Sequence, residues 1–284
     1  MTPQSALSTT SSLPPAKSPS TQLQHQHQQQ HPPTSILRNP TAQTYAHIHP
    51  FLVAGFFTLR FRALVDDPTT ALVSGLPVLA ALQGVYVVLC LPAARKSSSS
   101  SSSSSGGGVG KSGGLKRKNV EETAFARRIV PALLSLFLPL VLGTPLLSLI
   151  LILSGAPITT HLPATLLCAA HMSLLAGTSL VYVHGTEGSA WREIFGLARA
   201  MDAVWGGAVG VGLGAWVGAV PIPLDWDRPW QEYPITIIAG AYIGYIVGCM
   251  AGRTPLLYGR RIQFAEDEAG GESAGAGLEK DKKS

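Results

Sequence analysis

The chain has 284 residues, of which 46% are hydrophobic and only 13% are charged, and its formal net charge is +5. Soluble domains carry about a quarter charged residues, so this composition excludes an ordinary soluble protein and indicates several membrane spans. The basic residues lie between apolar runs and form no patch interleaved with aromatic residues, which argues against nucleic-acid binding. Cys90, Cys168 and Cys249 all lie inside apolar runs, with neither a disulfide framework nor zinc-ligand spacing.

Residues 1–44 are rich in Ser, Thr, Pro, Gln and His. They lack the apolar surface that offsets chain entropy, so we expect a disordered tail. The segment has no apolar core ahead of a cleavage site, so a signal peptide is not predicted. The histidines at positions 25, 27 and 31 are better explained by this polar composition than by metal binding, and we predict no metal site and no cofactor.

Six apolar stretches follow the tail. Each is close to the roughly 20 residues that a helix needs to cross the hydrocarbon core of a membrane. The expected spans are 46–65, 71–91, 129–153, 162–183, 201–221 and 234–252. The sequence therefore predicts an all-α polytopic membrane protein with about six transmembrane helices. Its predicted organisation is a disordered tail (1–44), spans 1 and 2 (45–92), a Ser/Gly-rich basic loop (93–128), spans 3 to 6 (129–252) and a charged tail (253–284).

The first span is the weakest of the six. Its apolar core, FLVAGFFTL, is short, and Arg60 and Arg62 follow directly. Arginines within a span are functional by default, whereas those near one end can extend to the interface, and we favour the second interpretation. If this stretch only lies in the interface, five spans remain and the N-terminus changes sides.

The distribution of basic residues predicts the topology. Of the 21 lysines and arginines, 18 fall in the two tails, the loop between spans 2 and 3 and the loop between spans 4 and 5. In a six-span protein all of these segments lie on one side, and basic segments favour the cytosol. We therefore expect both termini to be cytosolic and the loop between spans 5 and 6 to be lumenal or exoplasmic.

The loop at 93–128 contains SGGGVGKSGG, which nearly matches a phosphate-binding loop. The motif requires its first glycine where Ser105 stands, and it requires a strand before the loop and a helix after it. A polyserine run precedes this segment instead. We interpret it as a flexible linker that binds no nucleotide.

Two glycine ladders mark the last two spans. They are Gly206, Gly210, Gly214 and Gly218 in span 5, and Gly240, Gly244, Gly248 and Gly252 in span 6. A repeat of four places each ladder along one helix face. In lipid, small residues let helix backbones approach closely and gain van der Waals contact. The ladders therefore predict helix packing, either of span 5 against span 6 or of one ladder against a span of another protein. Both interpretations stay open, because a helix has more than one face.

The connection between these two spans is rich in proline. Pro221 suits the end of span 5, and Pro234 can open span 6, where its missing N–H costs nothing. Trp226 and Trp230 suit the membrane interface, where aromatic rings lie at headgroup depth. This pattern predicts a rigid interfacial turn.

The same connection carries two carboxylates and a guanidinium. Asp225 and Asp227 with Arg228 could hold a divalent ion or contact a phosphate. Two carboxylates alone make a poor metal site, and no histidine clearly joins them from the same face. We therefore favour solvated charges on a rigid turn over a catalytic centre.

The stretch GAWVGAVPIPLDWDRPWQEYPI, with the glycine-rich span after it, resembles the Pig-F family of GPI-anchor biosynthesis proteins. HIHPFLVAGFFTLRF and the following Asp66-Asp67-Pro68 also resemble the start of that family, so the resemblance covers roughly residues 45–260. The Ser/Gly-rich loop and both tails look like additions of a fungal type. The residues that carry the main motif are Trp216, Pro221, Pro223, Asp225, Trp226, Asp227, Arg228, Pro229 and Trp230.

The resemblance implies a multi-pass protein of the endoplasmic reticulum membrane. Members of the family stabilise large ethanolamine phosphate transferase subunits, which modify the third mannose of the GPI glycolipid and, with another partner, the second. Because those partners carry the metal-dependent catalytic domain, this chain is expected to be a non-catalytic subunit. Its lumenal loop would contact the transferase or the GPI precursor glycolipid.

Two alternatives stay open beside this interpretation. One is an integral membrane phosphotransferase that uses Asp225 and Asp227, and the other is a GPI lipid transporter. The C-terminal KDKKS places Lys282 and Lys280 third and fifth from the end, which resembles a dilysine retrieval signal for the endoplasmic reticulum. Such signals are read by receptors and are not anchors, and an ordinary charged tail explains the lysines equally well.

Overall fold

The structure is a computed structural model that describes residues 31–94, 128–223 and 228–261. The described residues from Pro33 onward belong to one compact unit. Several expectations fall outside the described residues and are not tested: the histidines at positions 25 and 27, the glycine-rich segment near Ser105, and the side chains of Asp225, Trp226, Asp227, Lys280 and Lys282.

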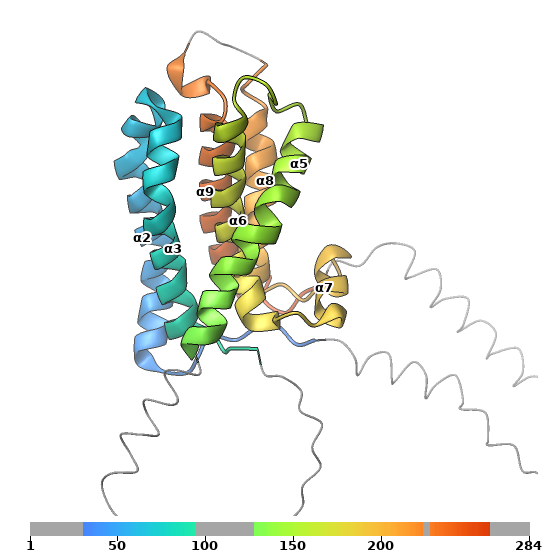
Figure 1. The fold of residues 1–284 in the computed structure, drawn as a ribbon. Helices are drawn as coiled ribbons and strands as arrows, with labels where there is room; N and C mark the ends of the chain where they lie inside the picture. Colours follow the sequence, from blue (N-terminus) through green and yellow to red (C-terminus); the bar gives the residue numbers. More distant parts are fainter. Residues whose placement is uncertain (1–30, 95–127, 224–227, 262–284) are drawn as a thin grey trace, which may run out of the picture. The chain divides into compact units, whose positions relative to one another are not determined.

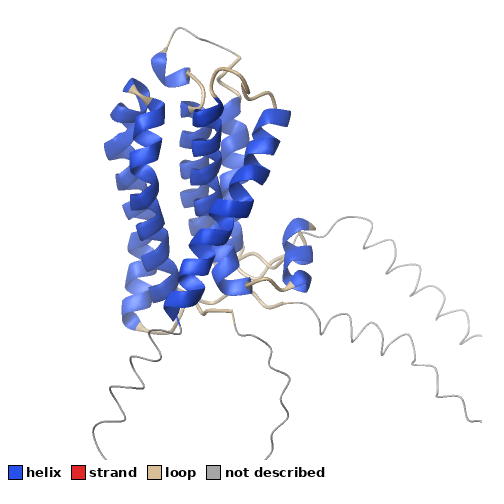
Figure 2. Cartoon of the chain, viewed as in Figure 1, coloured by secondary structure: helices blue, strands red, loops and turns tan. Residues whose placement is uncertain are grey.

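The described residues form helices joined by loops and turns, and they contain no strand (Figure 2). Its helices are α2 (Pro40–Asp66), α3 (Pro68–Cys90), a helix over Arg128–Leu153 that includes the π-turn η1 (Pro139–Gly143) and α5 (Thr144–Leu153), α6 (Leu162–His184), the short α7 (Gly188–Phe195), α8 (Ala203–Ala219), the 3₁₀ turn η2 (Pro229–Gln231) and α9 (Ile235–Ala251). Four of them are long and apolar enough to cross a membrane, and α8 and α9 are shorter apolar helices. At 17 residues each, α8 and α9 still extend about 26 Å. The predicted all-α polytopic fold is confirmed.

Successive apolar helices run in alternating directions (Figure 1). The α2–α3 turn, residues 154–161 and the α8–α9 connection lie at one end, called here the loop end. Residues 33–39, 91–94, 185–202 and 252–261 lie at the other, called the termini end. Segment 185–202 contacts two of the others directly. The N–H of Met201 donates to the carbonyl of Arg260 over 2.7 Å, and the N–H of Thr34 donates to the carboxylate of Asp202 over 2.7 Å.

The first span, expected to be weak, is the longest helix. It has 27 residues and begins at Pro40, before the tail boundary expected at residue 44. Asn39 caps it by accepting from the N–H of Thr41 over 3.3 Å, and Pro40 suits the first helical position. These two local signals lie before the apolar core, so a count of apolar residues alone misses them.

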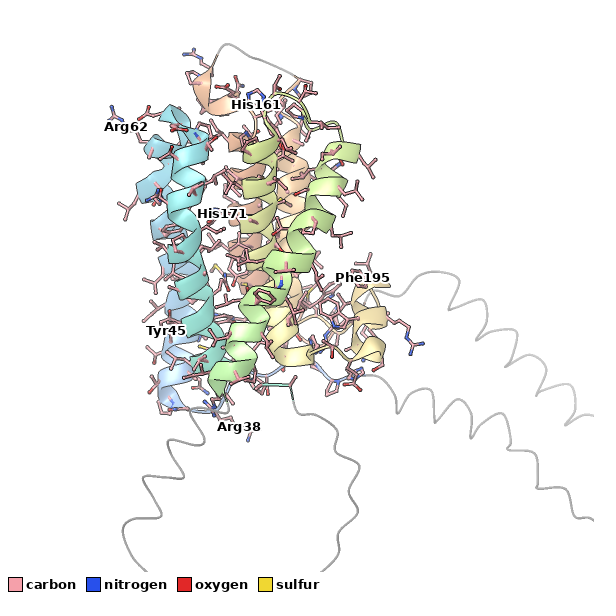
Figure 3. The ribbon with its side chains drawn as sticks, in the orientation of Figure 1. Arg38, Tyr45, Arg62, His161, His171 and Phe195 are labelled. Carbon is pink, nitrogen blue, oxygen red and sulfur yellow. The ribbon has the colours of Figure 1, made fainter. Side chains whose placement is uncertain are left out.

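Arg60 has partners on α3. Its guanidinium donates to the carbonyl of Ala71 over 3.0 Å and to the hydroxyl of Ser74, both in the first two turns of α3, and its position at the interface stays a prediction. Arg62, two residues further on, is exposed (Figure 3). The difference arises because α3 packs directly on α2 and presents acceptors at that depth, whereas Arg62 lies on another side of the helix.

α6 is the central helix. Its apolar window is 67% buried, against 17–33% for the other three long helices, and it packs against α3, α5, α8 and α9. Small residues allow this: Gly177 packs on Pro139, and Ser173 donates to the Pro139 carbonyl. Pro139 opens the π-turn η1, a local widening of the helix that often accompanies proline.

Candidate functional site

The two glycine ladders face each other across α8 and α9. A Cβ added at Gly210 would lie 2.0 Å from the carbonyl oxygen of Gly244, and one at Gly244 would lie 2.0 Å from that of Gly210. Gly214 and Gly240 meet in the same way, as do Gly206 and Gly248. No side chain fits between backbones this close, so the ladders pack α8 against α9. The same ladder glycines also line an open groove along both helices, so docking of a span of another protein stays a prediction beside internal packing.

Two cavities flank this hairpin. One, the α8–α9 groove, is a cavity of about 650 Å³ along both helices, apolar along its length and bordered at the loop end by Trp230. The other, the α5–α8 cleft, is a cavity of about 1070 Å³ between α5, α6 and α8. Both reach the connection that carries the family-like motif.

The walls of the α5–α8 cleft are divided by polarity. Along the helices they are apolar, with Ile150 from α5, Met172 from α6 and Trp216 from α8. Polar side chains lie at the loop end only: Ser154, Thr160, His161, Arg228, Glu232 and Tyr233. Trp216 is 72% exposed, so this wall faces the surroundings of the bundle as well as the cleft.

The described motif residues surround the mouths of both cavities. Pro221 and Pro223 follow the end of α8, as expected, and Pro223 and Arg228 line the cleft. Pro229 begins η2, which turns the chain back so that Trp230 borders the groove on the other side. Asp225, Trp226 and Asp227 lie outside the described residues, so the hypothesis of a paired-carboxylate site remains a hypothesis. Among the described residues, no group of three His, Cys, Asp or Glu side chains lies close enough to hold a metal.

The loop end is fastened to α6 by a chain of hydrogen bonds. The hydroxyl of Tyr233 donates to the hydroxyl oxygen of Thr165 over 2.8 Å, and Thr165 donates to the carbonyl of His161 over 3.1 Å. The rings of His161 and Tyr233 meet edge to face, with centroids 6.4 Å apart. Burial raises the pKa of Tyr233 to about 12, so its hydroxyl stays a donor at neutral pH. These contacts hold the polar rim of the cleft in place.

A buried histidine that sequence reasoning did not assign lies in the centre of the bundle (Figure 3). Nε2 of His171 lies 3.0 Å from the carbonyl of Leu72, so Nε2 carries the proton and donates. Nδ1 must then accept from the hydroxyl of Tyr242, 2.8 Å away. The histidine thereby joins α3, α6 and α9. The sequence could have indicated this histidine, because it stands alone in the expected span 162–183 and an ionisable side chain within a span needs polar partners.

A second polar group joins α9 to α2 and α3 nearer the termini end. Arg253 donates to the carbonyl of Ala46 and, over 3.3 Å, to the hydroxyl of Tyr86. His49 stacks on Tyr86 with ring centroids 4.2 Å apart. Arg253 lies 207 residues from Ala46 and 167 residues from Tyr86 in the sequence, so neither of its contacts could be predicted from local sequence.

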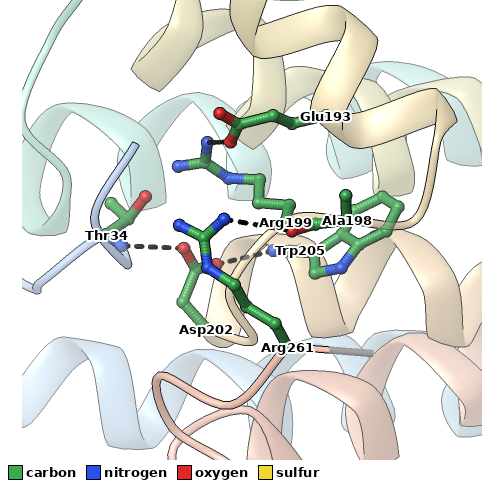
Figure 4. Close-up of polar contacts among 7 residues, drawn as sticks. All are labelled: Thr34, Glu193, Ala198, Arg199, Asp202, Trp205 and Arg261. Atoms are coloured by element: carbon green, nitrogen blue, oxygen red, sulfur yellow. Dashed lines mark hydrogen bonds and ion pairs between the residues drawn. The ribbon is translucent and has the colours of Figure 1, made fainter. Parts of the chain in front are cut away.

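Asp202 organises the termini end (Figure 4). One carboxylate oxygen caps α8 by accepting from the N–H of Trp205 over 2.8 Å, and the other accepts from the N–H of Thr34 over 2.7 Å. Arg199 lies beside it and forms an ion pair with Glu193 at 3.7 Å. Burial lowers the pKa of Arg199, and the carboxylates of Asp202 and Glu193 oppose that shift. The chain at Thr34, within the tail expected at residues 1–44, is thus tied to the start of α8.

These features define a class: a polytopic helical membrane protein whose last two helices form a glycine-packed hairpin between two cavities. Residues 48–253 match the model of the GPI biosynthesis protein family Pig-F, and the chain belongs to this family. The resemblance inferred from the motif between Trp216 and Trp230 is therefore confirmed.

Relatives cover most of the chain. It is 45% identical over 260 residues to glycosylphosphatidylinositol anchor biosynthesis protein 11 of Aspergillus fumigatus, covering 84% of this chain and 88% of the relative. The protein of the same name in Neurospora crassa is 41% identical over 230 residues, with 81% of each chain covered. A mouse protein described as the stabilizing subunit of GPI ethanolamine phosphate transferase is 32% identical over 121 residues, which cover 41% of this chain and 55% of the mouse protein. No solved structure matches the chain.

Proposed function

We propose that this chain is a membrane subunit that stabilises the ethanolamine phosphate transferase acting on GPI mannoses, the third and possibly the second, and that it is not itself the catalyst. The observation that carries the proposal is family membership over residues 48–253, together with the description of the mouse relative as a stabilizing subunit. The partner would be a large transferase subunit, which supplies the chemistry.

The hairpin suits such a role because it is rigid. Backbone contact along α8 and α9 fixes both ends of the connection that carries the motif. Trp230, 46% exposed at the mouth of the α8–α9 groove, is a suitable anchor for a partner, since exposed tryptophans contribute strongly to interfaces. We infer that the loop end contacts the transferase or its glycolipid, and the α8–α9 groove lined by the ladder glycines offers a second surface for a partner span.

The charges of the described residues support cytosolic termini. Arg38, Arg128, Arg192, Arg199, Arg253, Arg260 and Arg261 lie at the termini end, against Arg60, Arg62 and Arg228 at the loop end. Basic residues favour the cytosolic side. The proposal therefore places the loop end in the lumen of the endoplasmic reticulum and leaves Lys280 and Lys282 accessible to cytosolic retrieval factors.

The first experiment depletes the chain from its native cells and follows two quantities, the level of the transferase subunit and the ethanolamine phosphate content of GPI. Both should fall, and both should return on expression of the wild-type chain. A variant carrying Asp225→Asn and Asp227→Asn should restore both as well. If the purified wild-type chain alone transfers ethanolamine phosphate and this variant does not, the carboxylates take part in the chemistry and the non-catalytic proposal is wrong.

The second experiment tests the contact surface. Affinity purification in mild detergent should recover the transferase with the wild-type chain and less of it with Trp230→Ala. The matched control is Phe195→Ala, which removes a side chain that is 73% exposed but lies on α7 at the termini end. Equal recovery with both variants would contradict a contact at Trp230.

A further inference from the structure

The α5–α8 cleft has the polarity of a site for an amphipathic molecule. Its apolar walls follow membrane-spanning helices, and its polar residues are confined to the loop end. A ligand that fits must be apolar over the helical part of the cleft and charged at one extremity. Membrane lipids have this form, and the bilayer around the bundle supplies them.

The charges at the rim indicate which headgroup fits. Arg228 is a permanent cation and suits a phosphate, to which guanidinium groups bind in a bidentate manner. His161 lines the same rim, and because its Nδ1 shares a hydrogen bond of 2.8 Å with Thr160, its Nε2 is the ring nitrogen that can offer a second polar contact. Glu232 adds a carboxylate to the same rim. One cation and one carboxylate complement a headgroup that carries both a phosphate and an ammonium group.

The size of the cleft suits a single lipid. Its volume of about 1070 Å³ is just above the usual range for ligand pockets, about 300–1,000 Å³.

We propose that the α5–α8 cleft binds one zwitterionic glycerophospholipid from the bilayer. Its acyl chains lie along α5 and α8 beside Trp216, its phosphate lies at Arg228, and its ammonium group faces Glu232. This inference does not rest on the proposed stabilising function, because binding is a property of the chain alone and needs no transferase.

The first test fills the cleft. Gly212 lines it, and a Cβ added there meets nothing within 4 Å, so Gly212→Leu places a side chain in the cleft without disturbing the α8–α9 contact. Gly55→Leu on α2 is the matched control, because its added Cβ also meets nothing within 4 Å and Gly55 does not line the cleft. The purified full chain is reconstituted in vesicles of equal parts phosphatidylethanolamine, phosphatidylcholine and phosphatidylglycerol. It is then extracted in mild detergent, and its retained lipid is measured by native mass spectrometry.

The wild-type chain and Gly55→Leu should each retain one zwitterionic phospholipid, and Gly212→Leu should lose it while eluting as a folded monodisperse species. Unchanged retention in Gly212→Leu would overturn the proposal. If that variant keeps its lipid and instead recovers less transferase from cells, the cleft is a docking surface for a partner helix. The stabilising function would then stand while the lipid site fell.

The second test addresses the headgroup. Arg228→Gln removes a charge-assisted hydrogen bond and should lower retention about tenfold. The matched control is Arg62→Gln, an exposed arginine of the same end that does not line the cleft, and it should change nothing. Glu232→Gln should abolish the preference for zwitterionic lipids over phosphatidylglycerol. If the wild-type chain already retains phosphatidylglycerol equally well, the assignment of the headgroup is wrong.

Discussion

Replacing Gly210 by alanine tests the backbone contact between α8 and α9 with a single methyl group. The added carbon would lie 2.0 Å from the oxygen of Gly244, 2.8 Å from its carbonyl carbon and 3.2 Å from the Cα of Gly248. None of these atoms can move without moving α9. Overpacking costs about 1–3 kcal/mol, and backbone obstacles place this case at the top of that range. Alanine returns about 1 kcal/mol as the better helix former, which leaves a net loss of about 2 kcal/mol.

The matched variant is Gly212→Ala, two residues along the same helix. Its added Cβ meets nothing within 4 Å, so only the helix preference remains, and we expect no loss or a gain of up to about 1 kcal/mol. Unfolding of both variants and of the wild-type chain in mixed micelles, titrated with SDS and followed by far-ultraviolet circular dichroism, measures the difference. About 2 kcal/mol corresponds to a shift of roughly thirtyfold in the folding equilibrium. Equal midpoints for the two variants would refute the inferred contact.

Three further predictions concern the polar contacts at the two ends. Tyr233→Phe removes the donor to Thr165 and should cost about 1 kcal/mol in the same titration, whereas an unchanged midpoint would show that this bond does not hold the loop end. Asp202→Ala removes the cap of α8 and the acceptor for Thr34; it should cost about 1–2 kcal/mol and make the chain near Thr34 more sensitive to limited proteolysis, with Asp202→Asn less affected. Hydrogen bonds from the Thr70 side chain and from the N–H groups of Thr70 and Thr69 hold the pKa of Asp67 below its ordinary value of 3.8. The stabilisation from Asp67 is therefore complete above pH 3.8 and is lost as the pH falls through the lower, folded-state pKa. When the pH is lowered below about 4, the thermal unfolding midpoint of the wild-type chain should therefore decrease, and that of Asp67→Asn should decrease less.

The helices and the hairpin could be predicted because their signals are local. Runs of about 20 apolar residues predict spans, and a glycine at every fourth position predicts a face for close packing. The facing of the two ladders follows once a short connection joins the spans. The start of the first span also has a local sequence signal, since Asn39 caps the helix and Pro40 takes its first position.

The polar contacts could not be predicted because they depend on which helices become neighbours. The direction of Arg60 is set by acceptors on α3, and the pairing of His171 with Tyr242 joins positions 71 residues apart. The α5–α8 cleft likewise depends on how two helices stand on either side of α6. A period of apolar residues says which face of a helix is buried, but not which helix covers it.

The glycine contact has a mechanical consequence. Because α8 touches α9 through backbone atoms and not through side chains that can change rotamer, the two helices cannot slide past each other without a clash. The α8 wall of the cleft is therefore fixed to α9. The opposite wall belongs to α5, which follows a π-turn at Pro139–Gly143 and is joined to α6 by residues 154–161. The α8 wall is thus rigid, whereas the α5 wall can move. Any widening of the cleft must therefore come from a tilt of α5.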